Sequence, residues 1–470
     1  MGEEHERGRT GAHGPLRYLR RAAAATPAHR DRYIDFLRAV AISLVVLGHW
    51  LAAVIVADDG GVRGDNALAH LDWAQSLTWF FQVMPVFFLV GGYANAASMD
   101  AHRRRGGDGP GWFLGRTDRL LRPTTAFLAV LWTTALAARL LGVPPEPLGL
   151  GVWAASIPLW FLAAYLGVVL CAPAMDHLHR RHGLTVPAVL VLAVLALDGL
   201  RLGAGLPLVG QANHLLVWLA LHQLGFVWRD RWTEARPGVP AALAAGGVGA
   251  LVLLTAVGPY PASMVDVPGA DLGNTSPPTF ALLVLGLTQA ALVVAVAAPV
   301  RRALRRRGPW TAVIAVNAVV LTLFLWHMTA AVLTGALVYG TGLFPQPPVD
   351  SAAWVLMRIP WLLAVLPVLL VLVAVFGGVE ARTTASSAGW RAGALRGVPA
   401  GRAVANLLVL AASPMVIGGL VWIALAGPGH HGIGTLPTAA CLVYAVGAST
   451  LRLARRARAR DGPGGTGREE

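Results

Sequence analysis

Residues 32–57 read RYIDFLRAVAISLVVLGHWLAAVIVA, an apolar run that begins among charges and carries a histidine well inside it. A helix needs about 20 apolar residues to cross the hydrocarbon core of a bilayer, and this run is long enough. Arg32, Asp35 and Arg38 stand at its entrance, and His49 lies deep within it. The stretch therefore predicts a membrane-spanning helix that holds an ionisable ring where such groups are costly.

Runs of this kind recur along the whole chain. Of its 470 residues, 56% are hydrophobic and only 13% are charged, and the mean hydropathy is +0.59. Because lipid cannot satisfy backbone N–H and C=O groups, spanning segments are helices or closed barrels, and these runs are too long and too little alternating for barrel strands. The sequence therefore predicts an all-α polytopic membrane protein with about twelve transmembrane helices. Their expected positions are 34–56, 78–98, 122–141, 152–171, 184–200, 211–228, 239–257, 279–298, 311–339, 353–376, 404–426 and 433–451.

The basic residues predict how these helices are oriented. All 38 of them are arginines. If the N-terminus lies in the cytoplasm and the spans alternate, all but Arg63, Arg139, Arg201 and Arg358 fall on the inner side. This distribution satisfies the positive-inside rule and predicts a plasma-membrane protein with both termini cytoplasmic. The formal charge of +14 is then a topology signal, and nucleic-acid binding is disfavoured because no binding module interrupts the helices.

Composition divides the chain into five segments. Residues 1–30 form a basic tail that is expected to be disordered, and residues 31–382 hold the first ten spans. A cytoplasmic linker over 383–403 precedes two additional transmembrane helices within 404–453, and a flexible tail follows over 454–470. The predicted architecture is therefore a ten-helix unit with a two-helix addition.

Arg38 and His49 share one face of the first predicted helix. They are 11 residues apart, which corresponds to roughly 20° around a helix and roughly 16 Å along its axis. An imidazole suits general-base work, because its unperturbed pKa is about 6.5, and an arginine at the inner end suits a ligand that carries phosphate. Asp35 could pair with Arg32 or with Arg38. The alternative is that His49 is a neutral interior histidine bonded to a neighbouring helix.

This helix resembles the opening helix of the integral-membrane acyltransferase 3 family. The family pattern is an Arg–x–x–Asp–x–x–Arg–Ala–x–Ala start, here from Arg32 to Ala41, followed by a histidine, here His49. Four further segments resemble the family in the same order along the chain, and together the five matches cover roughly residues 31–382. These segments are MPVFFLVGGY (84–93), GWFLGRTDRLLRP (111–123), PLWFLAAYL (158–166) and LTLFLWHM (321–328).

The resemblance implies an enzyme, an acyltransferase for groups other than aminoacyl groups. Such enzymes move an acyl group, here expected to be acetyl, from cytosolic acyl-coenzyme A to a hydroxyl of a carbohydrate, an envelope glycan or a small metabolite. It implies that His49 is the catalytic base and that Arg38 and Asp35 are catalytic with it. The basic residues that would hold the coenzyme A phosphates are Arg32, Arg116, Arg119 and Arg122. Contacts to the acceptor or to the oxyanion would come from Trp160 and His327.

Several alternatives stay open from the sequence. The Arg–x–x–Arg pair of the family matches either Arg116 with Arg119 or Arg119 with Arg122. About twelve spans with both ends inside also suit a secondary transporter, and a catalytically inactive membrane scaffold is a further alternative. No metal is predicted, because His214 and His222 are too far apart for a helical ligand pair and no carboxylate joins them. The expected partners are membrane lipid and a hydroxylated acceptor.

Overall fold

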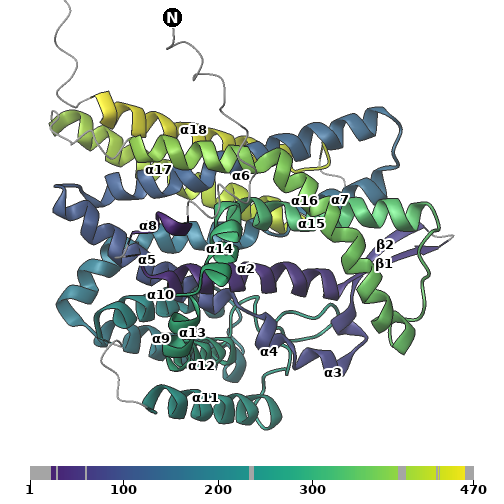
Figure 1. Ribbon diagram of the computed structural model, residues 1–470, viewed down its shortest axis with the longest axis horizontal. Coiled ribbons are helices and arrows are strands. Elements are labelled where there is room, and N and C mark those ends of the chain that lie inside the picture. The colour runs from purple at the N-terminus through teal and green to yellow at the C-terminus, as the bar shows by residue number, and fades with distance from the viewer. Residues whose placement is uncertain are drawn as a thin grey trace, which may run out of the picture.

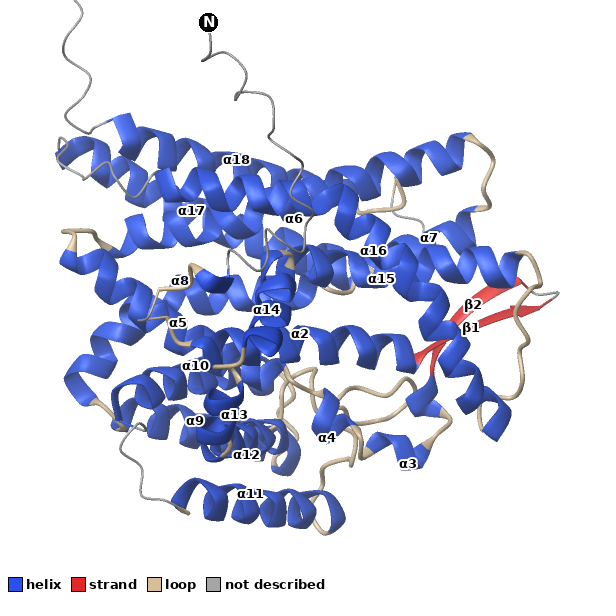
Figure 2. Cartoon of the chain, in the orientation of Figure 1, coloured by secondary structure: helices blue, strands red, loops and turns tan. Residues whose placement is uncertain are grey.

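The computed structural model describes residues 23–27, 30–58, 61–231, 238–389, 399–429, 432 and 434–460. Helices make up 79% of the structure, and the strands among the described residues form one two-stranded sheet (Figure 2). The all-α class predicted from the apolar runs is therefore confirmed. Most of the predicted tail over 1–30, and residues 461–470, lie outside the described residues.

The long helices run roughly side by side across the molecule (Figure 1). They are α2 (Arg32–Ala52), α5 (Met84–Arg104), α6 (Gly109–Leu140), α8 (Leu159–His182), α9 (Thr185–Gly203), α10 (Asn213–Arg231), α11 (Val239–Ala256), α12 (Phe280–Ala295), α15 (Val320–Gly340), α16 (Ala352–Gly389), α17 (Pro399–Leu425) and α18 (Thr438–Arg460). The shorter elements connect them. They are β1 (Ala53–Asp58), β2 (Gly61–Asn66), η1 (Ala67–Ala69), α3 (Asp72–Gln75), α4 (Thr78–Phe81), α7 (Pro145–Ser156), η2 (Val209–Ala212), α13 (Ala297–Ala303) and α14 (Arg307–Ala318).

The predicted count of twelve spans is not confirmed. Within the described ranges, nine helical segments are long and apolar enough to cross a membrane, or ten if α12 and α13, which bend by 52°, form one span. The predicted spans 211–228 and 433–451 are helical, as α10 and α18, but do not qualify. The reason is polar content: α10 contains two histidines and three charged residues, and α18 ends in a run of arginines.

Two predicted spans end or break earlier than the hydropathy suggested. The first was expected to reach residue 56, but α2 ends at Ala52, and the following β-branched residues pair as β1 with β2 in antiparallel register. Such residues favour extended backbone. The window 311–339 breaks at Val319 into α14 and α15. Glu380 of α16 stabilises the break, because its carboxylate accepts the backbone N–H of Leu321 (3.1 Å) and of Thr322 (2.8 Å) at the start of α15.

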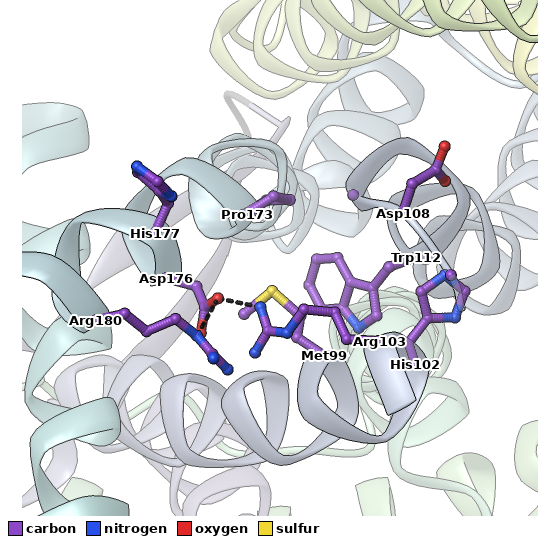
Figure 3. A pocket seen from close by; sticks show the side chains of 11 residues that line it. Met99, His102, Arg103, Asp108, Trp112, Pro173, Asp176, His177 and Arg180 are labelled. Carbon is purple, nitrogen blue, oxygen red and sulfur yellow. Dashed lines mark hydrogen bonds and ion pairs between the residues drawn. The ribbon is translucent and has the colours of Figure 1, made fainter. Parts of the chain in front are cut away.

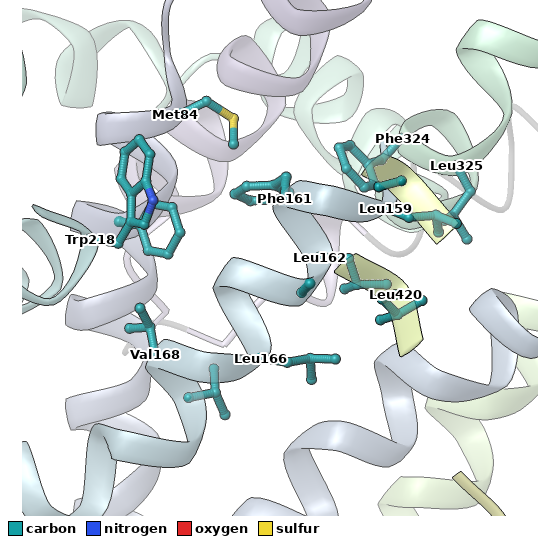
Figure 4. Packing of buried hydrophobic residues seen from close by; sticks show 14 of the residues in the cluster. Met84, Leu159, Phe161, Leu162, Leu166, Val168, Trp218, Phe324, Leu325 and Leu420 are labelled. Atoms are coloured by element: carbon teal, nitrogen blue, oxygen red, sulfur yellow. The ribbon is translucent and has the colours of Figure 1, made fainter. Parts of the chain in front are cut away.

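Helix α2 passes through the middle of the bundle, with α17 and α18 along one edge and α11 along the opposite edge (Figure 1). Buried aromatic and aliphatic side chains from several helices fill the interior, among them Phe161, Trp218 and Phe324 (Figure 4). Helices α5 and α10 approach most closely at Gly92, where a Cβ atom would lie 1.9 Å from a backbone carbonyl oxygen of α10. Only glycine permits that approach.

The last two helices belong to the same bundle. Helix α17 packs on α18 and on α8, and α18 packs on α6. The predicted linker over 383–403 overlaps the end of α16 and the start of α17, while 390–398 lie outside the described residues. Helix α18 continues to Arg460, into the segment predicted as a flexible tail, because its arginines pair with carboxylates of α6.

Candidate active site

Two histidines meet inside the bundle. His49 of α2 and His327 of α15 lie with Nδ1 of the first 2.8 Å from Nε2 of the second. Their rings stack almost in parallel, with centroids 5.1 Å apart and an interplanar angle of 9°. His327 is 0% exposed, whereas His49 is half-buried. The structure therefore joins the two histidines that the sequence analysis had singled out separately.

The hydrogen-bond partners fix which ring nitrogens carry protons. His327 Nδ1 lies 2.7 Å from the carbonyl oxygen of Phe324, and a carbonyl only accepts, so Nδ1 of His327 carries a hydrogen. Nε2 of the neutral His327 ring then accepts from Nδ1–H of His49. Nε2 of His49 is left with its lone pair, and no described side chain donates to it. His49 is thus held in the tautomer that can accept a proton.

Three hydrogen bonds hold the helices around this pair. The indole of Trp50 donates to the carbonyl oxygen of His327 (2.9 Å), and the indole of Trp361 donates to that of Trp50 (2.9 Å). Arg358 donates to the carbonyl oxygen of Ala53 (2.9 Å), and its guanidinium lies over the ring of Trp354. Because α2, α15 and α16 are tied together at this level, the two imidazoles are held in fixed positions.

A basic cluster lies at the end of the bundle where α2 begins. Arg116 of α6 donates to the hydroxyl of Tyr165 on α8 (3.2 Å), and the charge of Arg38 acts on both of them. Asp35 is buried and pairs with Arg30 at 2.6 Å and with Arg38 at 3.5 Å. Arg38 and Arg116 therefore share one site, with Asp35 as an ion-pair partner one helical turn away.

The other predicted arginines have different surroundings. Arg32 donates to the carbonyl oxygen of Leu304 (2.9 Å) and stacks over Trp310, which fastens α2 to the α13–α14 region. Arg122 pairs with Asp118 at 3.1 Å, on the side of α6 that faces α18. Arg119, which lies between Arg116 and Arg122 in the sequence, is half-buried. The structure places Arg116, a member of one of the two possible Arg–x–x–Arg pairs, near Arg38.

Aromatic rings connect the basic cluster to the histidine pair. Phe161 lies 6.1 Å from Tyr165 and 5.2 Å from Phe324 between ring centroids, and Phe324 lies 6.2 Å from His327. Figure 4 shows Phe161 and Phe324 side by side in the packed interior. Trp160 is half-buried with its ring edge-on to Phe161 at 6.4 Å, outside the polar contacts of the histidines.

The sequence analysis missed this aromatic series, although Phe161 and Tyr165 stand four residues apart in a segment that it quoted. That spacing puts both rings on one helix face and was the available signal. On α2 itself, Ile42 (1% exposed) and Val46 (8% exposed) occupy the interval between Arg38 and His49. A packed apolar layer therefore separates the basic cluster from the histidine pair.

A cavity of about 310 Å³ opens at the basic end of the bundle (Figure 3). Trp112 lines it and stands one helical turn before Arg116 on α6. Arg103 and Arg180 also line it, and both pair with Asp176. Sequence reasoning did not find this cavity, because its walls come from the ends of α5, α6 and α8.

A bundle of membrane-length helices with a histidine pair inside and paired arginines at one end defines an integral-membrane protein with a buried polar site. The model of a family described as an acyltransferase domain matches residues 31–378, and the chain belongs to this family, acyltransferase 3. The resemblance predicted from the five sequence segments is thereby confirmed. No curated protein and no solved structure matches the chain significantly. The family places the chain among membrane acyltransferases in general, and α17 and α18 lie beyond the matched residues.

Proposed function

We propose that this protein transfers an acyl group, expected to be acetyl, from cytosolic acyl-coenzyme A to a hydroxyl of a carbohydrate, an envelope glycan or a small metabolite. The observation that carries the proposal is the chain of hydrogen bonds from Phe324 through His327 to His49, which leaves Nε2 of His49 as a free base. Membership of the acyltransferase 3 family supports the reaction class. We place the protein in the plasma membrane with both termini in the cytoplasm, as the arginine distribution predicts.

The proposed reaction is a single transfer. Nε2 of His49 takes the proton of the acceptor hydroxyl while the hydroxyl oxygen attacks the thioester carbonyl carbon. The carbon–sulfur bond breaks, and the coenzyme A thiolate takes the proton back from His49, so that an ester and free coenzyme A leave. Base assistance of this kind contributes roughly 10²–10⁴-fold. His327 keeps its hydrogen bond throughout and stabilises the imidazolium that forms.

In this mechanism His327 acts as a positioning residue. Both of its ring nitrogens already have partners, His49 and the carbonyl oxygen of Phe324. The sequence analysis had considered His327 as an oxyanion donor, a role that would need a free N–H. The geometry supports orientation of His49 instead, in the way that a hydrogen-bond acceptor fixes the tautomer of a catalytic imidazole.

We assign the donor to the basic end of the bundle. Arg38 and Arg116 are two guanidinium groups within one site, and Asp35 is the carboxylate that pairs there. Guanidinium groups bind phosphate oxygens in a bidentate manner, and Tyr165 adds a hydroxyl beside them. We place the nucleotide end of coenzyme A in the cavity next to Trp112, which Arg103 and Arg180 also line. The thioester arm would then extend along Phe161 and Phe324 and displace the apolar layer.

The test is release of free coenzyme A thiol by the purified full-length protein with acetyl-coenzyme A and membrane extracts as the acceptor source. His49→Ala should abolish release while the melting temperature stays close to that of the unchanged protein. His214→Ala, at an exposed histidine of α10, is the matched control and should keep full activity. Persistent transfer by His49→Ala would refute the assignment, and a carrier would leave acetyl-coenzyme A intact.

The acceptor is identified in cells. Mass spectrometry of envelope glycans and secreted metabolites, with and without the gene, should reveal a species that differs by one acyl group. The mass difference gives the acyl chain, and the species gives the acceptor. Identical profiles under all growth conditions, together with inactive purified protein, would favour the non-catalytic scaffold.

A further inference from the structure

The two C-terminal helices lie outside the family match. The second of them, α18, contacts α6 through three arginines that are spaced three residues apart. Arg452 donates to the hydroxyl of Thr125 at 3.0 Å. Arg455 forms an ion pair with the carboxylate of Asp118, and Arg458 forms one with that of Asp108. Three arginines on one side of α18 therefore contact the N-cap and two further positions of the helix that carries Arg116.

The ion pair between Arg458 and Asp108 lies at the cavity beside Trp112. Arg458 is 3% exposed and binds both carboxylate oxygens, with Nη1 2.7 Å from Oδ1 and Nη2 2.8 Å from Oδ2. Asp108 also caps α6, because Oδ1 accepts the backbone N–H of Gly111 at 2.9 Å, and it lines the cavity beside Trp112. The hydrogen bonds from Arg458 hold the pKa of Asp108 below its ordinary range. The carboxylate is therefore charged, and α18 supplies its countercharge.

The pair at Asp118 lies still closer to the basic cluster. Asp118 is buried and stands two residues from Arg116 on α6, and it also pairs with Arg122. Without Arg455 this buried carboxylate would lose a countercharge. An uncompensated carboxylate there would repel a phosphate bound at Arg116 from across the helix, since charges interact over longer distances where water is scarce.

We propose that the α17–α18 hairpin completes the donor site: Arg455 and Arg458 are positioning residues that neutralise Asp118 and Asp108, so that the basic end attracts the phosphates of the acyl donor. This inference rests on the proposed function. It assigns a role to the segment beyond the matched domain: its arginines balance the negative charges on the side of α6 that faces away from the donor. The hairpin contributes to donor affinity without touching the donor.

The experiment compares arginine variants with charge-matched doubles in the full-length protein. R455Q should raise KM for acetyl-coenzyme A about tenfold, the effect of one added unit charge in a medium of intermediate polarity. R458Q should raise it less, because the side chain of Asp108 is 44% exposed and water screens its charge, and kcat should stay within about twofold in both variants. R455Q/D118N and R458Q/D108N should restore KM. R452Q is the matched control, because it removes an α18–α6 hydrogen bond without exposing a carboxylate, and its KM should stay unchanged.

A second donor separates charge from packing. S-acetylpantetheine carries the same thioester without phosphate, so its KM should be unaffected in R455Q and R458Q. Equal KM increases for both donors, or no rescue by the doubles, would overturn the inference. If R455Q does not fold, a raised KM in R455Q/D118N would overturn it as well. Should the unchanged protein use acetyl-coenzyme A while both single variants keep its KM, the inference fails alone. If the unchanged protein neither binds nor consumes acetyl-coenzyme A, the proposed function fails and the inference falls with it.

Discussion

The hydrogen bonds from Phe324 through His327 to His49 predict that His327 is needed as a hydrogen-bond acceptor. Two substitutions of His327 can test this. His327→Leu removes the acceptor for Nδ1–H of His49 and keeps a side chain of similar bulk in a site that is fully buried. His327→Gln keeps a carbonyl oxygen that can reach the same hydrogen. The first should therefore lose transfer activity, and the second should retain part of it.

The size of the loss follows from one hydrogen bond. A buried donor left without its acceptor costs about 1–3 kcal/mol, and each 1.4 kcal/mol is about a tenfold change in an equilibrium. The competing tautomer, in which Nε2 of His49 carries the proton, is therefore favoured by roughly 5–150-fold relative to the native protein. We expect kcat of His327→Leu to fall by that factor. His49→Ala should lose more, about 10²–10⁴-fold, because it removes the base itself.

The assay is initial-rate release of coenzyme A thiol at saturating acetyl-coenzyme A, combined with thermal unfolding of each variant. The reasoning predicts the order native, His327→Gln, His327→Leu, His49→Ala, with KM for the donor nearly constant. If His327→Leu keeps kcat within about twofold of the native value at an unchanged melting temperature, the tautomer argument is wrong. If the Gln and Leu variants lose kcat and stability equally, His327 acts through packing.

Three further predictions concern the donor site and the bundle. Arg38→Gln should raise KM for acetyl-coenzyme A by about 10–100-fold with a smaller effect on kcat, because a charge-assisted hydrogen bond to phosphate contributes about 1.5–3 kcal/mol; initial rates at varied donor concentration measure it. Gly92→Ala should lower stability by about 1–3 kcal/mol, because its Cβ would lie 1.9 Å from a carbonyl oxygen of α10. Gly246→Ala on α11 meets nothing within 4 Å and should melt no lower than the native protein. Arg458 lowers the pKa of Asp108 in the folded state, so this pair stabilises the protein at pH values above the unfolded pKa of about 4. The stabilisation is lost as pH falls through the lowered folded pKa. Melting curves from pH 7 to 3 should therefore show a weaker acid dependence in Asp108→Asn.

The helices could largely be predicted, because hydropathy is a local property of the chain. The run that contains Arg38 and His49 formed α2, and the run that contains His327 formed α14 and α15. The hydropathy window could not show that Glu380, far along the chain, stabilises the break before α15. It also could not show that the end of the first run pairs as a hairpin, since an apolar β-branched stretch suits either structure until its partner strand is known.

The placement of the candidate site residues could be predicted in part. Helical periodicity correctly put Arg38 and His49 on one face of α2, and the resemblance singled out His327. The choice among the loop arginines depended on which face of α6 meets α8 and which meets α18, and neither contact is encoded in the spacing. Trp160 was expected near the substrate, whereas its neighbours Phe161 and Tyr165 make the contacts that join the basic cluster to the histidines.

By itself the sequence determined that this chain is a bundle of membrane helices of the acyltransferase 3 family. The length of the apolar runs, the positions of the arginines and the short motifs are all local features of the sequence. Only the tertiary structure decided that His49 receives its acceptor from a residue 278 positions away, and that arginines of α18 pair with Asp108 and Asp118 at and within α6. The physical reason is the range of the forces involved. Burial in lipid acts on each helix separately, whereas hydrogen bonds and ion pairs act only between groups that packing has brought within a few ångströms of each other.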